Sequence, residues 1–415
     1  MMRIAALAVA FAGLAGAGTS VFGMETYSPH DDGLNAFLAL PAAERRTKFL
    51  DESYRKDVLA SKPAKVNGHR VRTGHQRTVP LSWPGEDKGT YTVRVTDKST
   101  GAVVLEVGTK GPSCNLDSLE IGRGYAWSVV DGTTTNAGEF AIAAEPPRLV
   151  YMPGVGNSRD IGGWVGLGGR RVRQGRIYRS GALESVKNGK RYSKVKPEDA
   201  AEIVRRYGIR TELDLRSESE IGGIDSSVLG PSVKWVNLHA GFYAGALCER
   251  GRKEYRAIFD LLLDESRYPI IYHCAAGQDR TGTLSFTLNA LLGVSEDDLF
   301  RDWEMSGLAN PSARFVHEKC IDEFVTELKK ECPAPTVRES CEKFVRACGV
   351  TDEEIARFRK FMLDPSPVGS AHFAPRFCYN TGDMKHYFPP PMIILAFAVP
   401  YRQLPVYQRD ETVDD

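Results

Sequence analysis

The sequence predicts two domains, an all-β sandwich followed by an α/β domain in which helices flank a mostly parallel sheet. Short β-type runs, several alternating apolar and polar residues, occupy about residues 64–145, with Gly, Asp, Asn and Pro turn signals between them. From about residue 150, apolar strand-like runs alternate with amphipathic helical segments. The length of 415 residues is sufficient for two domains, each with its own core.

The N-terminus has the pattern of a secretory signal peptide. Met1-Met-Arg3 is a short basic region, and the apolar run that follows ends on the small residues Ala15-Gly-Ala17. We therefore predict a signal peptide over residues 1–23 and an exported protein, either periplasmic or secreted. The alternative is a retained membrane anchor. Because the run is too short to span a bilayer, we expect no transmembrane anchor.

Two segments separate this N-terminus from the α/β part. Residues 25–62 are charged and helical in pattern, and we predict either a spacer or a segment that packs on the next domain. Within residues 64–145, a Leu-x-Trp pattern at Trp83 and a Tyr-x-Trp pattern at Trp127 resemble a fibronectin type III module. We place both tryptophans in the sandwich core, the alternative being a platform that stacks on sugars. Such a module is expected to contact a protein or a glycan.

The α/β domain is predicted over residues 150–365. Its helix at residues 197–208 has Pro197 in the first turn and Gly208 at its end, as is typical of helix boundaries. Two strands, Ile209–Leu215 and Val233–Leu238, follow this helix. A second helix, Lys253–Asp264, then leads to the strand Ile270–His273. Sheets of this kind bind their ligands at the carboxyl ends of the strands. Residues 366–415 fit no regular pattern, and we predict an irregular tail.

Charge and cysteine content exclude several classes of protein. The chain has 54 Lys and Arg against 53 Asp and Glu, a net charge of +1, so a nucleic-acid partner is not expected. Four of the eight cysteines lie in one helical stretch, where one or two disulfides are compatible with export. These four are Cys320, Cys332, Cys341 and Cys348. Cysteine pairs with metal-ligand spacing are absent from the sequence, and we expect neither a metal nor another cofactor.

The segment His273–Gly282 carries the strongest functional signal. It follows the buried strand-like run Ile270–Tyr272 and leads into a helical pattern. A cysteine on a small-residue loop before a helix N-terminus lies where backbone N–H groups and the helix dipole converge. This environment favours a thiolate and can bind a phosphate dianion. Arg280, six residues after Cys274, adds a planar fork for phosphate oxygens. We therefore predict attack of the Cys274 sulfur on phosphorus, the alternative being a buried structural cysteine.

The same Cys-x5-Arg spacing recurs at Cys332–Arg338. This second segment contains no glycine and has two prolines, which remove amide donors from the loop, and no predicted strand precedes it. We interpret the second match as chance.

Four motifs together resemble a known family. His273-Cys-x-x-Gly-x-Asp-Arg-Thr-Gly282 resembles the phosphate-binding loop of cysteine-dependent protein tyrosine phosphatases, above all the bacterial tyrosine/dual-specificity branch, whose loop has aspartate immediately before the arginine. Three upstream motifs resemble the same branch in the same order: Asn157-Ser-Arg-Asp-Ile-Gly-Gly163, Gly175-Arg-Ile-Tyr-Arg-Ser-Gly181 and Ile209-Arg-Thr-Glu-Leu-Asp-Leu-Arg216. The resemblance covers about residues 150–362 and implies an α/β phosphatase domain.

The resemblance also implies roles for individual residues. Cys274 would be the nucleophile that forms a phosphocysteine, and Arg280 and the loop amides would hold the phosphoryl group. His273 would help to hold the thiolate and its loop, and Thr281 would hydrogen-bond the sulfur. The remaining positions expected to contact substrate are Ala275, Ala276, Gly277, Gln278 and Gly282.

The leaving oxygen requires a proton donor, because an alkoxide or phenoxide leaves poorly without one. By the resemblance, Asp279 is the general acid and would then act as base toward water. The alternative is a loop carboxylate paired with a neighbouring arginine. Asp214, at the end of a predicted strand, is the second candidate, and its alternative role is an N-cap for the following segment.

The sequence departs from the branch at Gln278, where lysine is common and is associated with phosphoinositide substrates. Glutamine donates hydrogen bonds but carries no charge, which argues against highly charged substrates. We predict a phosphomonoester phosphatase acting on phosphorylated protein or a small phosphomonoester, foremost on phosphotyrosine with dual specificity. One alternative is a phosphoinositide or inositol phosphate phosphatase. The other is a non-catalytic phosphate-binding module in which the β-sandwich is the working part.

Overall fold

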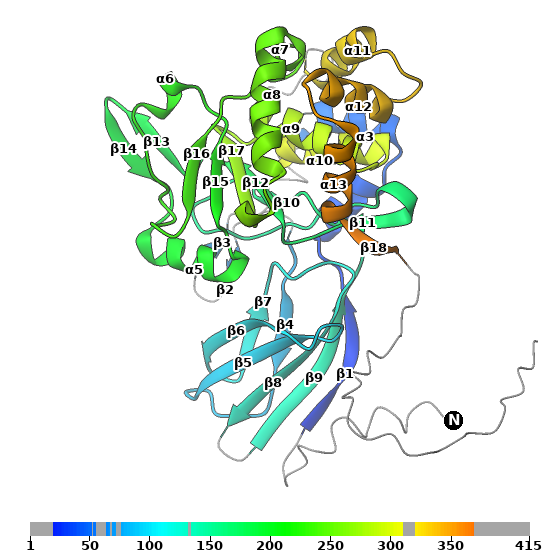
Figure 1. Cartoon of the computed structure of the whole chain (residues 1–415). Helices are drawn as coiled ribbons and strands as arrows, with labels where there is room; N and C mark the ends of the chain where they lie inside the picture. The colour runs from blue at the N-terminus through cyan, green and yellow to red at the C-terminus, as the bar shows by residue number, and fades with distance from the viewer. Residues whose placement is uncertain are drawn as a thin grey trace, which may run out of the picture. The chain divides into compact units, whose positions relative to one another are not determined.

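The computed structural model describes residues 20–51, 53–54, 64–66, 69–71, 76–131, 134–309 and 320–368 (Figure 1). The chain divides into two compact units, Met1–Ser370 and Ala371–Asp415, of which the second lies outside the described residues. Most of the predicted signal peptide and nearly all of the predicted tail therefore lie outside them as well. In the part that is described, no helix is long and apolar enough to cross a membrane.

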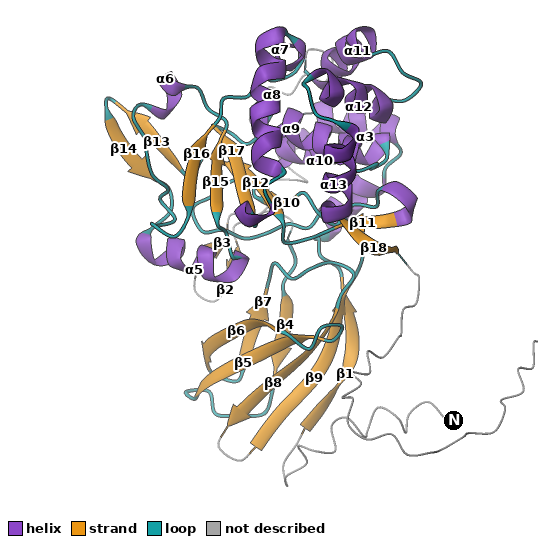
Figure 2. Cartoon of the chain, viewed as in Figure 1, coloured by secondary structure: helices purple, strands orange, loops and turns teal. Residues whose placement is uncertain are grey.

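A five-stranded mixed sheet organises the α/β region, residues 150–367 (Figure 2). Its strands, in spatial order, are β10 (Arg159–Asp160), β12 (Ile177–Gly181), β17 (Ile270–Cys274), β15 (Thr211–Asp214) and β16 (Lys234–Asn237). Strands β12, β17, β15 and β16 run parallel, and β10 pairs antiparallel with β12 at one edge. The central strand β17 is buried along its whole length, which accounts for its apolar sequence. The sheet is thus mostly parallel, as predicted.

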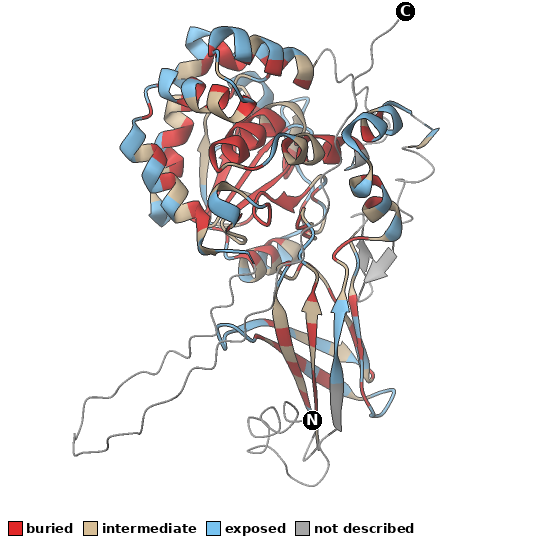
Figure 3. Cartoon of the chain, turned by 90° about the vertical axis from the view of Figure 1, so that its right-hand side faces the viewer, coloured by how far each residue is buried: buried red, intermediate tan, exposed pale blue. Residues whose placement is uncertain are grey.

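Helices cover this sheet, and one of them is enclosed on all sides. The helices are α5 (Pro197–Tyr207), α6 (Glu218–Ile221), α7 (Ala244–Leu247), α8 (Glu249–Leu262), α9 (Asp279–Leu291), α10 (Glu296–Ala309), α11 (Ile321–Glu331), α12 (Val337–Ala347) and α13 (Asp352–Met362). Helix α9 packs against β17, β12, α10 and α12. Every residue from Thr281 to Leu291 is buried, and Figure 3 shows this buried centre. The helix that follows the candidate loop is therefore rigidly placed.

Two short pairs complete the α/β region. Strands β13 (Glu184–Lys187) and β14 (Lys190–Ser193) form one antiparallel pair. Strands β11 (Arg170–Val172) and β18 (Leu363–Pro367) form the other, so the predicted tail boundary at residue 366 falls inside a strand.

The β region contains two sheets that share one hydrophobic core. Its strands are β1 (Ser20–Tyr27), β4 (Val79–Ser82), β5 (Thr90–Asp97), β6 (Val103–Lys110), β7 (Ser113–Leu116), β8 (Gly124–Asp131) and β9 (Thr134–Ile142). One sheet has the order β1–β9–β8–β5–β6, and the other is the pair β4–β7. Trp83 and Trp127 are 5% and 4% exposed, with ring centroids 6.2 Å apart. Both are core residues, as predicted, while the fibronectin type III assignment stays a prediction.

The segment predicted as a helical spacer begins with a β-strand, and its helices pack on the α/β region. Strand β1 pairs parallel with β9, so a signal peptide extending to residue 23 would remove part of a paired strand. Removal at Ala15-Gly-Ala17 would leave it intact. Helices α2 (Asp32–Ala39) and α3 (Ala42–Leu50) then bury Leu34, Phe37 and Phe49 in the core of the α/β region. They are not a spacer, because their apolar faces belong to the second domain along the chain. Two further short strands follow, β2 (Ala64–Val66) and β3 (His69–Val71).

Of the four cysteines for which the sequence suggested disulfides, Cys332, Cys341 and Cys348 are free thiols in the described part of the chain. Cys332, Cys341 and Cys348 are buried in the hydrophobic core of the α/β region. Burial raises the pKa of the Cys348 thiol to about 12, so the thiol stays protonated at neutral pH. Spacing alone could not distinguish core thiols from disulfide partners.

Candidate active site

Cys274 lies at the carboxyl end of the central strand β17, where parallel sheets bind ligands. In the sheet, Cys274 pairs with Gly181 of β12. The residue before it, His273, pairs with Asp214 of β15 on the other side. Cys274 is only 2% exposed, whereas Ala275 and Ala276 after it are exposed. The sulfur therefore sits at the base of the loop that residues 275–278 form before α9.

Two local features shape this loop: a glycine that allows its tight turn, and the start of α9, which has no side-chain cap. Gly277 has φ of +71°, and a Cβ there would lie 2.4 Å from the carbonyl oxygen of Ser180. No side chain fits that position. Gln278, the N-cap of α9, makes no side-chain capping hydrogen bond. The first-turn N–H groups of α9 are therefore left for an anion, in the orientation that the helix dipole favours.

The carbonyl groups of the loop are held from behind by two side chains. Asn157 Nδ2 donates to the oxygens of Ala276 at 3.2 Å and Gly277 at 2.9 Å. Arg179 also donates to the Gly277 oxygen, at 2.8 Å. Because the C=O and N–H groups of a peptide point in opposite directions, tying the carbonyls on the outside turns amides toward the inside of the loop.

A buried ion cluster fixes these supports. Asp302 of α10 accepts from Arg159 Nε at 2.8 Å and from Arg179 Nη1 at 2.6 Å, and Ser306 accepts from both arginines. Burial alone would raise the pKa of Asp302, but the two arginines outweigh it and hold that pKa below its ordinary value. Each arginine is thus paired with Asp302, and α10 is linked to the loop through charge-assisted hydrogen bonds.

Arg280 is the second residue of α9, and its guanidinium is already oriented. Its Nη1 and Nη2 donate to the two carboxylate oxygens of Glu220 on α6, at 2.5 and 2.7 Å. These hydrogen bonds lower the pKa of Glu220 to about 2 and, against the effect of burial, raise the pKa of Arg280. Among the described residues, Arg280 Nε is buried without a hydrogen-bond partner. Three of the five donors remain for a phosphate, which can bind while Glu220 stays in place.

Asp279 opens α9, and its carboxylate is held by an aromatic residue. Tyr243 Oη donates to Asp279 Oδ1 at 2.8 Å, and Trp303 Nε1 donates to Tyr243 Oη at 3.3 Å. Burial and the Asp279 charge raise the pKa of Tyr243, which therefore stays a neutral donor. Next to it, the exposed ring of Phe242 has its centroid 6.0 Å from the Arg280 guanidinium. The predicted alternative, an Asp279 paired with a neighbouring arginine, does not match this arrangement.

His273 and Asp214 form a buried layer beneath the loop. His273 Nε2 lies 2.9 Å from Glu212 Oε1, and its Nδ1 lies 3.8 Å from Asp214 Oδ1. Both carboxylate oxygens of Asp214 accept from Arg216, and Arg216 and His273 outweigh burial to hold the Asp214 pKa below its ordinary value. Asp214 is neither a proton donor by this geometry nor an N-cap, since Ser217 caps α6.

The structure brings together the predicted loop residues and adds others. Thr281 is buried at the base of α9, its hydroxyl without a hydrogen-bond partner in the described part of the chain. Asn157 and Arg179 lie in the upstream motifs, so the sequence contained a signal for them. Sequence reasoning assigned no role to Glu212, which lies in the third upstream motif, and it missed Glu220, Tyr243, Asp302 and Trp303, which lie outside these motifs. Their contacts cross between elements, which no local pattern reveals.

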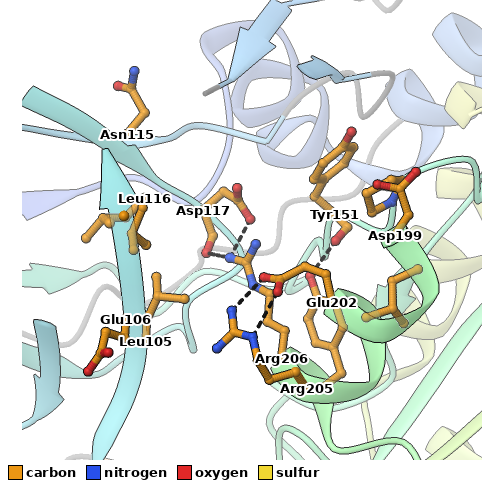
Figure 4. A pocket seen from close by; sticks show the side chains of 15 residues that line it. Leu105, Glu106, Asn115, Leu116, Asp117, Tyr151, Asp199, Glu202, Arg205 and Arg206 are labelled. Atoms are coloured by element: carbon orange, nitrogen blue, oxygen red, sulfur yellow. Dashed lines mark hydrogen bonds and ion pairs between the residues drawn. The ribbon is translucent and has the colours of Figure 1, made fainter. Parts of the chain in front are cut away.

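Two further observations concern metal binding and cavities in the described residues. Across the described ranges, no group of three or more His, Cys, Asp or Glu residues is placed to hold a metal ion. A cavity of about 310 Å³ lies between strands β6 and β7 and helix α5, and its lining does not include Cys274 (Figure 4). Its arginines pair within it, Arg206 with Asp117 and Arg205 with Glu202.

Comparison with known proteins agrees with this geometry. The model of the tyrosine phosphatase family matches residues 150–364, about half of the chain. The chain belongs to the tyrosine phosphatase family. It is 31% identical over 204 residues to a putative tyrosine-protein phosphatase of Cupriavidus necator, covering 41% of this chain and 70% of that protein. A solved structure, the core catalytic domain of the yeast PP-IP phosphatase SIW14 with citrate, is 17% identical. That likeness covers 37% of this chain and 86% of the yeast one, with a TM-score of 0.23, and supports no further argument.

Proposed function

We propose that this phosphatase hydrolyses phosphomonoesters through a phosphocysteine on Cys274, with phosphotyrosine in proteins as its main substrate. The observation that carries the proposal is the placement of Cys274 between the carboxyl end of a central parallel strand and the uncapped N-terminus of α9. Arg280, held by Glu220, stands at the same helix end. Strand end, free amides and guanidinium converge where a phosphate dianion would bind.

The reaction proceeds in two displacements. The Cys274 thiolate attacks phosphorus, the bond from phosphorus to the leaving oxygen breaks, and Asp279 delivers a proton to that oxygen. Water then attacks the phosphocysteine, Asp279 takes a proton from it, and the sulfur–phosphorus bond breaks to release phosphate and the thiolate. Arg280 and the loop amides hold the three equatorial oxygens in both steps. The buried hydroxyl of Thr281 is the group available to hydrogen-bond the sulfur.

The neighbourhood of the loop supports phosphotyrosine over more highly charged substrates. Gln278 brings no positive charge to the loop, and the exposed Phe242 ring beside Arg280 offers an apolar wall for an aryl group. The alternative is a phosphoinositide or inositol phosphate substrate, which would need more cations around the loop. Dual specificity is part of the proposal, because an exposed Phe242 does not exclude a smaller phosphoserine side chain.

We further propose that the enzyme is exported after removal of the N-terminal signal peptide, and that the β region is a fibronectin type III-like module. The N-terminal pattern of the sequence supports the first statement. The pair of sheets with a shared tryptophan-containing core supports the second. A protein or glycan contact is the role that we assign to this module.

The test is phosphate release by purified mature protein in the presence of a chelator, on phosphotyrosine peptides, phosphoserine peptides, phosphoinositides and inositol hexakisphosphate. We expect turnover of phosphotyrosine that Cys274→Ser abolishes and that Cys332→Ser, which changes another buried cysteine, leaves within about twofold. A folded, reduced wild type that releases phosphate from none of the four would overturn the proposal in favour of a phosphate-binding module. Preference for the inositol phosphates would overturn the substrate assignment only.

A further inference from the structure

Two helices outside the region that matches the tyrosine phosphatase family are built into its core. Helices α2 and α3 lie at residues 32–50, whereas the match begins at residue 150. Leu34, Phe37 and Phe49 are each 0% exposed and belong to the hydrophobic cluster that contains α9. The chain therefore leaves the α/β region after α3, forms the β region and returns. Buried apolar side chains therefore hold α2 and α3 on the α/β region, although the β region separates them from it in the sequence.

One of the contacts between α3 and α10 is made by a buried arginine. Arg45 is 0% exposed, its Nε donates to Glu304 Oε2 at 2.6 Å, and its Nη2 also binds Asp297. Burial disfavours the charged form of Arg45, but attraction to Glu304 and Asp297 outweighs it and raises the pKa of Arg45. The second buried carboxylate of α10, Asp302, supports the loop from the same helix. Because an unpaired buried charge is costly, Arg45 fixes α10 in one position.

An aromatic path leads from α3 to the proposed general acid. The rings of Phe49 and Trp303 have centroids 5.9 Å apart, with 51° between their planes. Trp303 Nε1 donates to Tyr243 Oη at 3.3 Å, and Tyr243 Oη donates to Asp279 Oδ1 at 2.8 Å. Trp303 also lies against the first turn of α9, since a Cβ on Gly282 would be 3.3 Å from its Cδ1. Three successive contacts thus join helix α3 to Asp279.

We propose that Phe49, Trp303 and Tyr243 are positioning residues that orient the carboxyl group of Asp279, and that helix α3 is part of the catalytic unit. This inference rests on the proposed function, in which Asp279 protonates the leaving oxygen. Tyr243 donates to Oδ1, so the transferable proton is confined to Oδ2, the oxygen free to face a leaving group. Trp303, supported by Phe49, fixes the position of the Tyr243 hydroxyl.

The leaving group provides a readout that a loss of stability alone would not change. Phenol is a weaker acid than p-nitrophenol, so phenyl phosphate depends on proton donation more strongly than p-nitrophenyl phosphate. The experiment measures kcat/KM for both substrates on the full mature chain, in wild type, Phe49→Leu and Phe37→Leu. Phe37 is equally buried in the same cluster, but its ring contacts Tyr54 at 6.5 Å. It is therefore the matched control for loss of core packing.

We expect both leucine variants to lower Tm by similar amounts. In Phe49→Leu the ratio of phenyl phosphate to p-nitrophenyl phosphate turnover should fall about 5- to 10-fold, a part of the full contribution of a general acid. In Phe37→Leu the ratio should stay at the wild-type value. Equal ratios in the two variants would overturn the inference, because Phe49 would then act only through stability.

A second variant keeps the inference testable if Phe49→Leu does not fold. Tyr243→Phe removes only the hydroxyl that binds Asp279, and we expect the same fall in the ratio, of about 10-fold. An unchanged ratio in folded Tyr243→Phe would also overturn the inference. If the wild type hydrolyses neither substrate, the proposed function fails separately. In that case the NMR resonance of the Asp279 carboxyl carbon, assigned by its loss in Asp279→Asn, tests the positioning inference. This resonance should shift in Phe49→Leu and stay unchanged in Phe37→Leu, and any other result would overturn the inference.

Discussion

Two segments of this chain have the same spacing of cysteine and arginine, but the cysteine ends a strand in one and a helix in the other. Cys274 ends a buried parallel strand and leads into a helix, whereas Cys332 ends helix α11 and is followed by the proline-containing connection to α12. The first sulfur therefore faces the start of a helix, and the second lies at the end of one. Helix dipoles attract an anion to the first site and repel it from the second.

The helices that follow the two cysteines also differ in how their N-termini are capped. Helix α12 has its own acidic cap, a capping box in which Thr336 and Glu339 satisfy each other's backbone N–H groups. Helix α9 begins at Gln278 with no side-chain cap. A capping box occupies part of the N–H groups at a helix start, whereas a start without a side-chain cap leaves those groups available to an anion. The comparison indicates that the local position, and not the spacing, suits the first segment to the proposed phosphate site.

Replacing the two arginines sharpens this comparison most. Arg280→Lys keeps the charge but loses the fork that binds Glu220 and phosphate oxygens together, so kcat/KM should fall by roughly a thousandfold. Arg338→Lys on α12 should change it less than about twofold. Steady-state kinetics on p-nitrophenyl phosphate measure both. Similar losses in the two variants would show that Arg280 has no special place in the site.

Loss of the proposed acid should have the next largest effect. Asp279→Asn keeps an acceptor for Tyr243 but cannot donate a proton to the leaving oxygen, so turnover of phenyl phosphate should fall by roughly a hundredfold. Turnover of p-nitrophenyl phosphate should fall much less, because its leaving group needs little protonation. Equal losses on the two substrates would remove Asp279 from the acid role and leave it as a structural carboxylate.

The sequence predicted the loop and the order of strands and helices because those depend on local patterns. Gly277, Cys274 and Arg280 could be assigned from a strand, small residues and a helix in succession. The partners Glu220 and Tyr243 could not, because each reaches the loop from a distant element with no pattern of its own. The helices at residues 32–50 fall within a segment that the sequence marked as charged and helical, but their packing partner is set by the tertiary fold.

Glu220 and Glu339 allow a matched comparison, since each is the third residue of its helix and part of a capping box. Gln preserves such a cap, so Glu220→Gln removes mainly the charge that holds Arg280. We expect kcat/KM to fall about tenfold in Glu220→Gln and to stay unchanged in Glu339→Gln. An unchanged Glu220→Gln enzyme would mean that phosphate alone orients Arg280.

The pH dependence of the same pair follows from the pKa of Glu220, which Arg280 lowers to about 2. A carboxyl group whose pKa is lower in the folded than in the unfolded state stabilises the fold above its unfolded pKa, about 4.3. That contribution is lost as the pH falls toward 2. Because the Glu220 side chain is 37% exposed, solvent screening should keep it below about 1 kcal/mol. Comparing Tm of wild type and Glu220→Gln from about pH 7 down to about pH 2, the lower limit of the titration, would measure it.

The smallest expected effect concerns the capped helix of the second segment. Thr336→Ala removes the hydroxyl that accepts from Glu339 N and should lower the free energy of unfolding by about 1 kcal/mol, with unchanged kcat/KM. Thermal unfolding and kinetics on the same preparation would check both. A loss of activity without a loss of stability would mean that the start of α12 communicates with the site. Since α12 packs on α9, that result would extend the supporting structure of the loop to the segment that resembles it only in spacing.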